Sequence, residues 1–234
     1  MGKLVVIATP IGNLDDISPR ALRALSEVEA LACEDTRTTR KIFQRYELEV
    51  PATLFSYHEH NEKRAGARIV GLLEAGGTVG LASDGGYPGI SDPGYRIINA
   101  AIEASHELEV IPGASAPPVA LLLSGLPVSS YTFKGFPPRK PGPRKRFLEM
   151  EMELPHTLIL FESPHRLAAL LRDAAEVLGE RPAAVCIELT KKFERVERGL
   201  LGELAARFAD AKPKGEVTVA IEGKRRVSRR GESE

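Results

Sequence analysis

The 234-residue sequence predicts an α/β protein with two domains. Short, continuous apolar runs, which are typical of strands buried on both faces of a sheet, alternate with segments of helical periodicity. This order predicts a mostly parallel sheet. The alternation stops between Pro112 and Pro143, where eight of the 17 prolines lie, and then resumes. We therefore predict an N-terminal α/β domain over 1–117, a C-terminal α/β domain over 118–223 and a charged, disordered tail over 224–234.

The elements expected before the proline-rich stretch follow one another closely. Ser18 and Pro19 are typical of the N-cap and first residue of a helix, and Gly76-Gly77 is typical of a helix end. In order, we expect a strand at 4–7, a helix after Ser18, a strand at 29–33, a helix at 62–75, a strand at 78–82, a helix at 95–104 and a strand at 108–111.

After the stretch we expect a strand at 156–161, a helix capped by Ser163-Pro164 that runs to Leu178, a strand at 183–189, a helix at 200–211 and a strand at 217–222. Between residues 110 and 148 the chain has six cations and no acidic residue, which predicts a mobile basic loop at 137–146. Such a loop suits a phosphate backbone, although a merely solvated loop has the same composition.

The composition excludes several classes of protein. The 32 basic residues balance the 32 acidic ones, so a wholly basic nucleic-acid binder is excluded, whereas a local basic patch is not. Cys33 and Cys186 lie far apart in apolar runs and are expected to be buried free thiols, which favours a reducing, cytoplasmic location. We expect neither a membrane helix, which needs roughly 20 apolar residues, nor a signal peptide.

The segment 83–94, with the sequence Ser-Asp-Gly-Gly-Tyr-Pro-Gly-Ile-Ser-Asp-Pro-Gly, carries the strongest functional signal. It follows a buried strand and precedes a helix, at the carboxyl end where α/β sheets bind ligands. A plain turn there needs about two to six residues, and the four glycines let backbone approach a ligand closely. We interpret it as a binding loop in which Asp84 holds a cationic or hydroxylated group. It matches neither a Walker A loop nor GxGxxG.

Two further polar segments leave expected strands. Residues 9–13 follow the first strand and residues 34–40 follow the second, so a parallel sheet would place both at the edge that carries the segment 83–94. Each segment taken singly is equally explained by a turn or by the N-cap of a short helix, at Asp35 or Thr36.

The segment His58-Glu59-His60-Asn61 is a candidate for substrate contact or acid–base chemistry. On a strand, the His-x-His spacing would place both rings on one face. A zinc site would need a further ligand, for which the sequence has no strong candidate, so we expect no metal. A solvated loop is the alternative.

Ten segments in a fixed order carry a resemblance to a known family. They are residues 8–14, 34–37, 56–62, 83–94, 112–116, 124–127, 135–136, 162–166, 188–191 and 214–216. The chain resembles the ribosomal RNA small-subunit methyltransferase I family, in the tetrapyrrole-methylase-like group, over all but about its last dozen residues. It departs from the family's usual residues at 85–88, where Tyr87 is bulkier than the usual threonine and could alter cofactor affinity, and also at 112–115 and 136–138.

The resemblance implies two α/β domains of the tetrapyrrole-methylase type, not Rossmann-type, with a cofactor cleft between them and a homodimeric assembly. It implies transfer of a methyl group from S-adenosyl-L-methionine to the ribose 2′-hydroxyl of a cytidine in the decoding region of 16S ribosomal RNA, either naked or in the small ribosomal subunit. By carry-over, the cofactor contacts are Asp84, Gly86, Ile90, Ser115, Ala116, Phe161, Glu162, Leu189, Lys214 and Gly215. Residues that would face the RNA are Gly12, Asn13, Asp35, Arg37, His58, His60 and Arg96, and the basic stretch adds Arg139, Lys140, Arg144, Lys145 and Arg146 as phosphate contacts.

A ribose hydroxyl is a poor nucleophile until its proton is removed. The catalytic candidates at the strand ends are Asp35, His58 and His60, with Glu34 and Glu59 as further proton acceptors. Carboxylates are weak bases unless burial raises their pKa, whereas histidine as a residue type titrates near neutral pH. Alignment of the two reactants without a dedicated base is a third alternative, and no metal is required.

Other functions fit the sequence less well. A related enzyme of the same fold would methylate a tetrapyrrole or a modified protein histidine, but the basic proline-rich stretch and the segment 56–61 favour RNA. A non-catalytic RNA-binding module would not need the glycine-rich segment 83–94. A nucleotide-dependent oxidoreductase would be expected to carry GxGxxG.

Overall fold

The computed structural model describes residues 1–225 and divides into two compact units, Met1–Ser115 and a second unit that begins at Ala116. The division falls two residues before the predicted boundary. From position 226 the expected tail lies outside the described residues, but its first two residues are ion-paired, Lys224 with Glu153 and Arg225 with Glu222. Within residues 1–225, no helix has both the length and the apolar character that crossing a bilayer requires.

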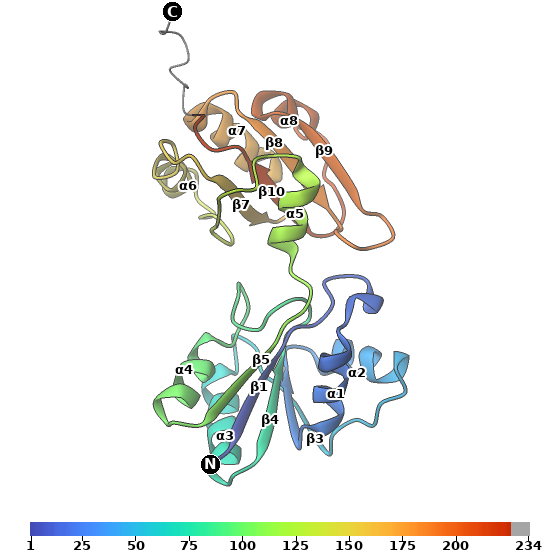
Figure 1. Cartoon of the computed structure of the whole chain (residues 1–234). Helices are drawn as coiled ribbons and strands as arrows, with labels where there is room; N and C mark the ends of the chain where they lie inside the picture. Colours follow the sequence, from blue (N-terminus) through green and yellow to red (C-terminus); the bar gives the residue numbers. More distant parts are fainter. Residues whose placement is uncertain (226–234) are drawn as a thin grey trace, which may run out of the picture. The chain divides into compact units, whose positions relative to one another are not determined.

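Unit 1 is a five-stranded parallel sheet with two helices on each face (Figure 1). Its strands are β1 (Lys3–Ile7), β2 (Ala30–Cys33), β3 (Thr53–Ser56), β4 (Thr78–Ala82) and β5 (Glu107–Ile111). They pair in the order β3-β2-β4-β1-β5, and every neighbouring pair is parallel. In a Rossmann sheet the first two strands are neighbours, whereas here β4 separates them. The prediction of a parallel, non-Rossmann sheet is therefore confirmed for this unit.

The helices of unit 1 follow the predicted periodicity. They are α1 (Pro19–Glu27), α2 (Thr36–Arg45), α3 (Glu62–Glu74) and α4 (Tyr95–Glu103), with a short 3-10 helix at Leu14–Asp16. Ser18 caps α1 as expected, because its side chain accepts a hydrogen bond of 3.1 Å from the backbone N–H of Ala21. Side chains alternate along β1, so that Val5 and Ile7 pack with α1 and α2 while Leu4 and Val6 pack with α3 and α4.

Unit 2 is built on a mainly antiparallel sheet, which corrects the expectation of a mostly parallel one. Its strands are β6 (Tyr131–Phe133), β7 (Thr157–Glu162), β8 (Pro182–Ile187), β9 (Arg195–Leu200) and β10 (Val217–Ile221). In the order β6-β7-β10-β8-β9, the last strand lies antiparallel between β7 and β8, and only β6 and β7 are parallel neighbours. The predicted alternation included β7, β8 and β10 but not β6 or β9, and strand direction depends on where β10 inserts.

Helices α6 (Pro141–Glu149), α7 (Leu167–Leu178) and α8 (Leu201–Arg207) cover one face of this sheet, and α5 (Ala116–Ser124) packs on the other. The prediction of a mobile loop at 137–146 is wrong, since α6 begins at Pro141. Both α5 and α6 carry two prolines in their first turn, where the missing N–H has no helical partner to lose. The predicted cap at Ser163-Pro164 is also wrong, because α7 begins only at Leu167.

Arg144 is buried in unit 2, which corrects its assignment as a phosphate contact. It exposes 3% of its surface on α6, and its Nη2 lies 2.7 Å from Oδ2 of Asp173 on α7. Its Nη1 also donates to the carbonyl of Arg139 at 3.1 Å. The guanidinium therefore fastens α6 and the segment before it to α7. Lys145 is likewise engaged, with Nζ 2.5 Å from Oε1 of Glu176.

We predict that Arg144→Ala lowers the free energy of unfolding by about 3–5 kcal/mol, because it leaves the buried Asp173 carboxylate without its partner. The exposed Arg146 is the matched control, and Arg146→Ala should change stability by less than about 1 kcal/mol. Urea unfolding followed by circular dichroism measures both. The joint replacement Arg144→Met and Asp173→Leu should recover most of the loss, and an unaltered Arg144→Ala midpoint would contradict the assignment.

Candidate active site

The polar segments singled out in the first half of the chain meet at one edge of unit 1. All five strands are parallel, so the loops that follow them emerge on the same side, here called the carboxyl edge. These loops are residues 8–13, 34–35, 57–61, 83–94 and 112–115. Together with the first turns of the following helices they carry Gly12, Asn13, Asp35, Arg37, His58, His60, Asp84, Gly86, Ile90, Arg96 and Ser115.

The segment 83–94 is tied to the loop after β1 by paired hydrogen bonds. The backbone N–H of Thr9 donates to the carbonyl of Gly86 at 2.9 Å, and the reciprocal bond is 3.0 Å. The buried hydroxyl of Thr9 also donates to the carbonyl of Ser83 at 3.0 Å. Gly94 has a φ of 147°, and a Cβ there would lie 2.8 Å from the backbone nitrogen of Gly89, so the loop closes on itself only with glycine at this position.

Tyr87, the bulkier residue in this loop, has a structural partner. The backbone N–H of Gly113 donates to its hydroxyl at 3.1 Å, which links the loop after β4 to the loop after β5. A shorter side chain such as threonine would not span this distance. The sequence showed the departure but not its partner, because the contact joins residues 26 positions apart.

Three carboxylates converge where β2 and β4 end. The backbone N–H of Asp35 donates to Oδ1 of Asp84 at 3.1 Å, and the backbone N–H of Asp84 lies 3.4 Å from Oε2 of Glu34. The pairing of Cys33 with Ala82 in the parallel register makes this meeting possible. The carboxylates of Asp84 and Glu34 are thus held by backbone from the neighbouring strand end, whereas that of Asp35 is held by Arg37.

These carboxylates differ in proton affinity. A bidentate hydrogen bond from the Arg37 side chain and the Arg37 backbone N–H lower the pKa of Asp35 to about 2. Burial raises the pKa of Glu34 and of Asp84, and the negative charge of the neighbouring carboxylates adds to both effects. Of the three, Asp35 is therefore the weakest proton acceptor.

His58 and His60 lie in a turn after β3. The expectation that a strand would place both rings on one face is therefore wrong. Their rings are nevertheless neighbours, with centroids 6.0 Å apart. Asn61 shapes this turn, because its Oδ1 accepts the His58 backbone N–H at 2.9 Å and its Nδ2 donates to the Ser56 carbonyl at 2.9 Å. Nδ1 of His58 is buried and has no hydrogen-bond partner in the described part of the chain. Among residues 1–225, no three His, Cys, Asp or Glu side chains gather as metal ligands would.

Cations stand at the helix ends that face the carboxyl edge. Arg37, Lys63 and Arg96 occupy the second residue of α2, α3 and α4, and the side chains of Arg37 and Arg96 are 89% and 80% exposed. The positive end of the helix dipole disfavours cations at this position. Two of them are paired with neighbouring carboxylates, Arg37 with Asp35 at 2.6 Å and Arg96 with Glu62 at 3.6 Å.

Unit 2 has an edge of its own where the predicted cofactor residues meet. Phe161 and Glu162 end β7, Leu189 follows β8, and Lys214 and Gly215 precede the antiparallel β10. Because Val217 pairs with both Glu162 and Ile187, all these positions lie at the same end of the sheet. The remaining predicted residue, Ala116, is the first of α5.

Two of the predicted cofactor contacts at the edge of unit 2 have buried side chains. Glu162 is 3% exposed, with Oε1 2.5 Å from Nη2 of Arg166, and Leu189 is 6% exposed. Contacts of these two residues with a ligand would thus have to come from their backbone. Leu189 lies between Glu188 and Thr190, which have φ values of 53° and 63°. Such conformations are strained for residues other than glycine and concentrate at binding sites; no sequence pattern indicated them.

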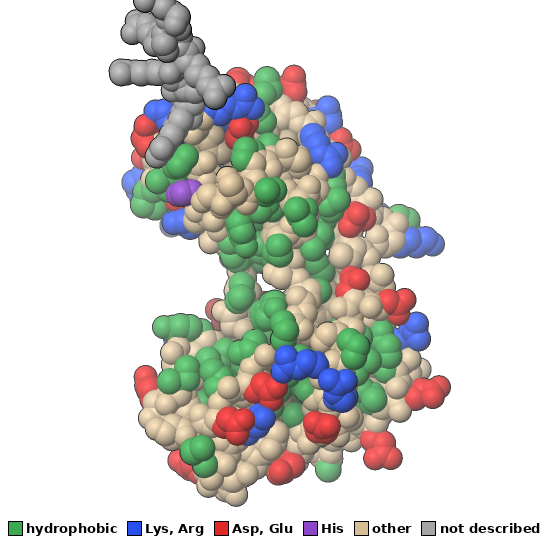
Figure 2. All heavy atoms as spheres, viewed as in Figure 1, with side chains coloured by type: hydrophobic (Ala, Val, Ile, Leu, Met, Phe, Trp, Pro, Cys, Tyr) green, Lys and Arg blue, Asp and Glu red, His purple; other side chains and the backbone are tan. Residues whose placement is uncertain are grey.

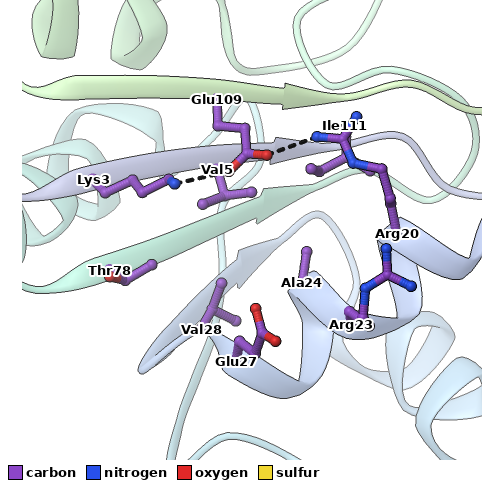
Figure 3. A pocket seen from close by; sticks show the side chains of 10 residues that line it. All are labelled: Lys3, Val5, Arg20, Arg23, Ala24, Glu27, Val28, Thr78, Glu109 and Ile111. Carbon is purple, nitrogen blue, oxygen red and sulfur yellow. Dashed lines mark hydrogen bonds and ion pairs between the residues drawn. The ribbon is translucent and has the colours of Figure 1, made fainter.

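A separate pocket of about 320 Å³ on unit 1 contains none of the predicted site residues (Figure 3). Three of its five charged residues are paired with one another, since Glu109 lies 2.9 Å from Nζ of Lys3 and 2.7 Å from Nη2 of Arg20. The pocket beside α1 therefore offers a ligand few unengaged charges and is not the candidate site.

Comparisons with known proteins place these features in context. Residues 3–205 match the family of Tetrapyrrole (Corrin/Porphyrin) Methylases. A protein of Micromonospora olivasterospora named ribosomal RNA small subunit methyltransferase I is 45% identical over 95% of this chain and 71% of its own length. A protein of the same name from Thermotoga maritima is 40% identical over 96% of this chain and 100% of its own length. Among solved structures, uroporphyrin-III C-methyl transferase from Thermus thermophilus, complexed with S-adenyl homocysteine, superposes with a TM-score of 0.64 and 18% identity over 94% of this chain and 97% of its own.

We predict that Arg37→Ala raises the pKa of Asp35 from about 2 towards the ordinary aspartate value of about 3.9. A carboxylate whose pKa is lowered by folding stabilises the folded state at pH values above its ordinary pKa. This contribution to stability is lost as the pH falls from about 4 to about 2. The variant should lack that pH-dependent loss. Carbon-13 NMR titration of the Asp35 carboxyl measures the shift. Arg40→Ala, which removes a neighbouring exposed cation, is the control, and an Asp35 midpoint that stays near 2 without Arg37 would contradict the prediction.

Proposed function

The chain belongs to the ribosomal RNA small subunit methyltransferase I family, within the tetrapyrrole methylases, and on that premise we propose that it methylates the ribose 2′-hydroxyl of a cytidine in the decoding region of 16S ribosomal RNA, with S-adenosyl-L-methionine as methyl donor. The observation that carries the proposal is identity of 40–45% to relatives of that name over 95–96% of this chain. The cytidine and the 2′-hydroxyl come from the family resemblance.

The residues of unit 1 suit the chemistry of the proposed cofactor. Asp84 lies at the surface, although its carboxylate is partly desolvated, and can accept hydrogen bonds from an ammonium group or from ribose hydroxyls. Ile90, in the same segment, is 49% exposed and offers apolar surface to an aromatic ring. When bound, S-adenosylmethionine supplies a methyl group on a sulfonium centre. We assign Asp84, Gly86, Ile90 and Ser115 to the cofactor from unit 1. From unit 2 we assign Ala116, Phe161, Glu162, Leu189, Lys214 and Gly215.

The cations at the helix ends support an RNA substrate. Arg37, Lys63 and Arg96 are positioned where backbone N–H groups and helix dipoles also favour anions. The N–H groups in the first turns of α3 and α4 donate to no capping side chain, so they remain available to phosphate oxygens. We propose that this edge binds the RNA backbone near the target nucleotide, with Gly12, Asn13, His58 and His60 among the contacts.

We propose different roles for two carboxylates of the carboxyl edge, Asp35 and Glu34. Asp35, whose pKa is about 2, is too weak a base to receive the ribose proton efficiently, so we propose that it caps α2 and orients Arg37. Glu34 lies next to it with a raised pKa and is the better acceptor. A positioned base contributes roughly 10²–10⁴-fold to such a reaction, and alignment of the hydroxyl can contribute more.

We propose that the protein forms a homodimer through the surface of α5. This helix is apolar around its whole circumference, although only one face packs on the sheet, through Leu121. Leu122 on the outer face is 71% exposed, and Figure 2 shows hydrophobic side chains gathered on unit 2 over α5. Helices of this kind are normally buried, and a second copy related by twofold symmetry would cover both copies at once.

The function is tested with purified protein, labelled S-adenosylmethionine and two substrates, naked 16S RNA and small ribosomal subunits. We expect one methyl group on a ribose 2′-oxygen of a cytidine, identified by nuclease digestion and mass spectrometry. The variant Glu34→Gln should lower the single-turnover rate at saturation by at least about 10²-fold, because it removes the acceptor.

The matched control is Asp35→Asn, in which asparagine preserves the helix cap, and its rate should fall less. A methyl group found on a base, a protein side chain or a tetrapyrrole would refute the proposed function. A normal rate in Glu34→Gln combined with a large loss in His58→Ala or His60→Ala would instead identify a histidine as the base.

For the assembly, we expect the wild-type protein to sediment as a dimer and Leu122→Glu to sediment as a monomer, since a buried carboxylate at the interface is costly. Ile102→Glu alters a comparably exposed apolar residue on α4 of unit 1 and should leave the dimer intact. Sedimentation velocity distinguishes the species. A monomeric wild type, or a dimer that persists in Leu122→Glu, would argue against the interface.

A further inference from the structure

An aromatic ring is presented to solvent at the end of the short strand β6. Phe136 is 56% exposed, although aromatic side chains are normally among the more buried. Its ring packs on Phe161 with a centroid distance of 5.6 Å, and Phe161 in turn makes an edge contact of 4.8 Å with Phe133. The exposed ring is therefore the outer member of a cluster of three inclined rings.

The backbone that carries this ring is firmly held. The N–H of Phe161 donates to the carbonyl of Gly135 at 3.0 Å, and Pro137 is buried directly after the ring. Farther on, the buried Arg144 holds the Arg139 carbonyl while it pairs with Asp173. A ring fixed in this way loses little conformational entropy when it binds a flat ligand.

Three exposed cations follow the ring along the chain. Arg139, Lys140 and Arg146 are exposed and make no ion pair within residues 1–225, in contrast to Arg144 and Lys145. Arg146 also lines an open hollow of about 690 Å³ that begins at Pro138 and runs along α6. A fixed aromatic ring beside unengaged cations is the arrangement with which proteins bind single-stranded nucleic acid, because the ring stacks on a base while the cations meet phosphates.

We propose that Phe136 is a stacking platform for an unpaired base of the RNA substrate, and that Arg139, Lys140 and Arg146 bind the adjoining phosphates. This proposal rests on the proposed function, because it presumes an RNA substrate. Of the five cations in this stretch, it keeps the three whose charges are not already engaged, and it adds the aromatic ring of Phe136.

The test measures RNA affinity, cofactor affinity and sedimentation for wild type, Phe136→Ala, Phe136→Tyr and Phe193→Ala. Phe193 is the matched control, since it is 74% exposed. Loss of one stacked base should weaken RNA binding by about 5- to 150-fold in Phe136→Ala, with little change in Phe136→Tyr or Phe193→Ala. The Phe136→Ala penalty should vanish when one particular unpaired nucleotide of the RNA is replaced by an abasic residue, because the partner of the ring is then already absent.

Several results would overturn the proposal. Unchanged RNA affinity in Phe136→Ala excludes the platform, and a penalty that persists for every abasic position excludes a base as its partner. If Phe136→Ala weakens S-adenosylmethionine binding and not RNA binding, the ring serves the cofactor. If it dissociates the dimer, the ring serves the second copy. Failure of the wild type to bind or methylate RNA would remove the proposed function itself, and the wild-type arm shows this before any variant is compared.

Discussion

The parallel pairing of the five strands of unit 1 is the constraint on which its chemistry depends. Parallel register places Cys33 beside Ala82 and Ile7 beside both Ala82 and Ile111, so the strands end together. Polar segments that are far apart in the chain must then emerge at one edge. The same geometry points the N-termini of α2, α3 and α4 towards that edge, and with them the positive ends of three helix dipoles. An edge that gathers carboxylates, histidines and helix N-termini therefore follows from the direction in which the strands run.

The chemical differences within this edge come from local partners. Glu34 and Asp35 are adjacent in sequence and have similar side chains, but their pKa values are shifted in opposite directions. Asp35 accepts hydrogen bonds from an arginine two residues later, whereas Glu34 is partly buried and faces another carboxylate. Asp35 is therefore the more acidic group and caps a helix, whereas its neighbour Glu34 has the higher proton affinity.

In unit 2, loops also gather at one end of the sheet, but through antiparallel pairing. Its final strand inserts antiparallel between β7 and β8, so the loop that precedes β10 joins the ends of two strands that point the opposite way. The helices are distributed unequally, three on one face and α5 on the other. That imbalance leaves apolar surface on α5, and the buried pair of Arg144 and Asp173 fixes α6 against the well-covered face.

The sequence by itself determined the elements whose causes are local. Apolar runs predicted β1, β2, β4 and β5, the cap at Ser18 predicted the start of α1, and the length and glycine content of the segment 83–94 predicted a binding loop. Its ordered motifs also indicated the family. Sequence patterns did not indicate α5 and α6, because proline, which breaks a helix at interior positions, is tolerated in its first turn.

Only the tertiary structure decided the features that depend on distant partners. Which of five basic residues remain free depended on Asp173 and Glu176, which are contributed by α7. Which carboxylate is acidic depended on contacts between the ends of β2 and β4, and the direction of β10 depended on the two strands that flank it. Sequence patterns report the preferences of short segments, whereas burial, ion pairing and strand direction are properties of contacts between segments that only folding brings together.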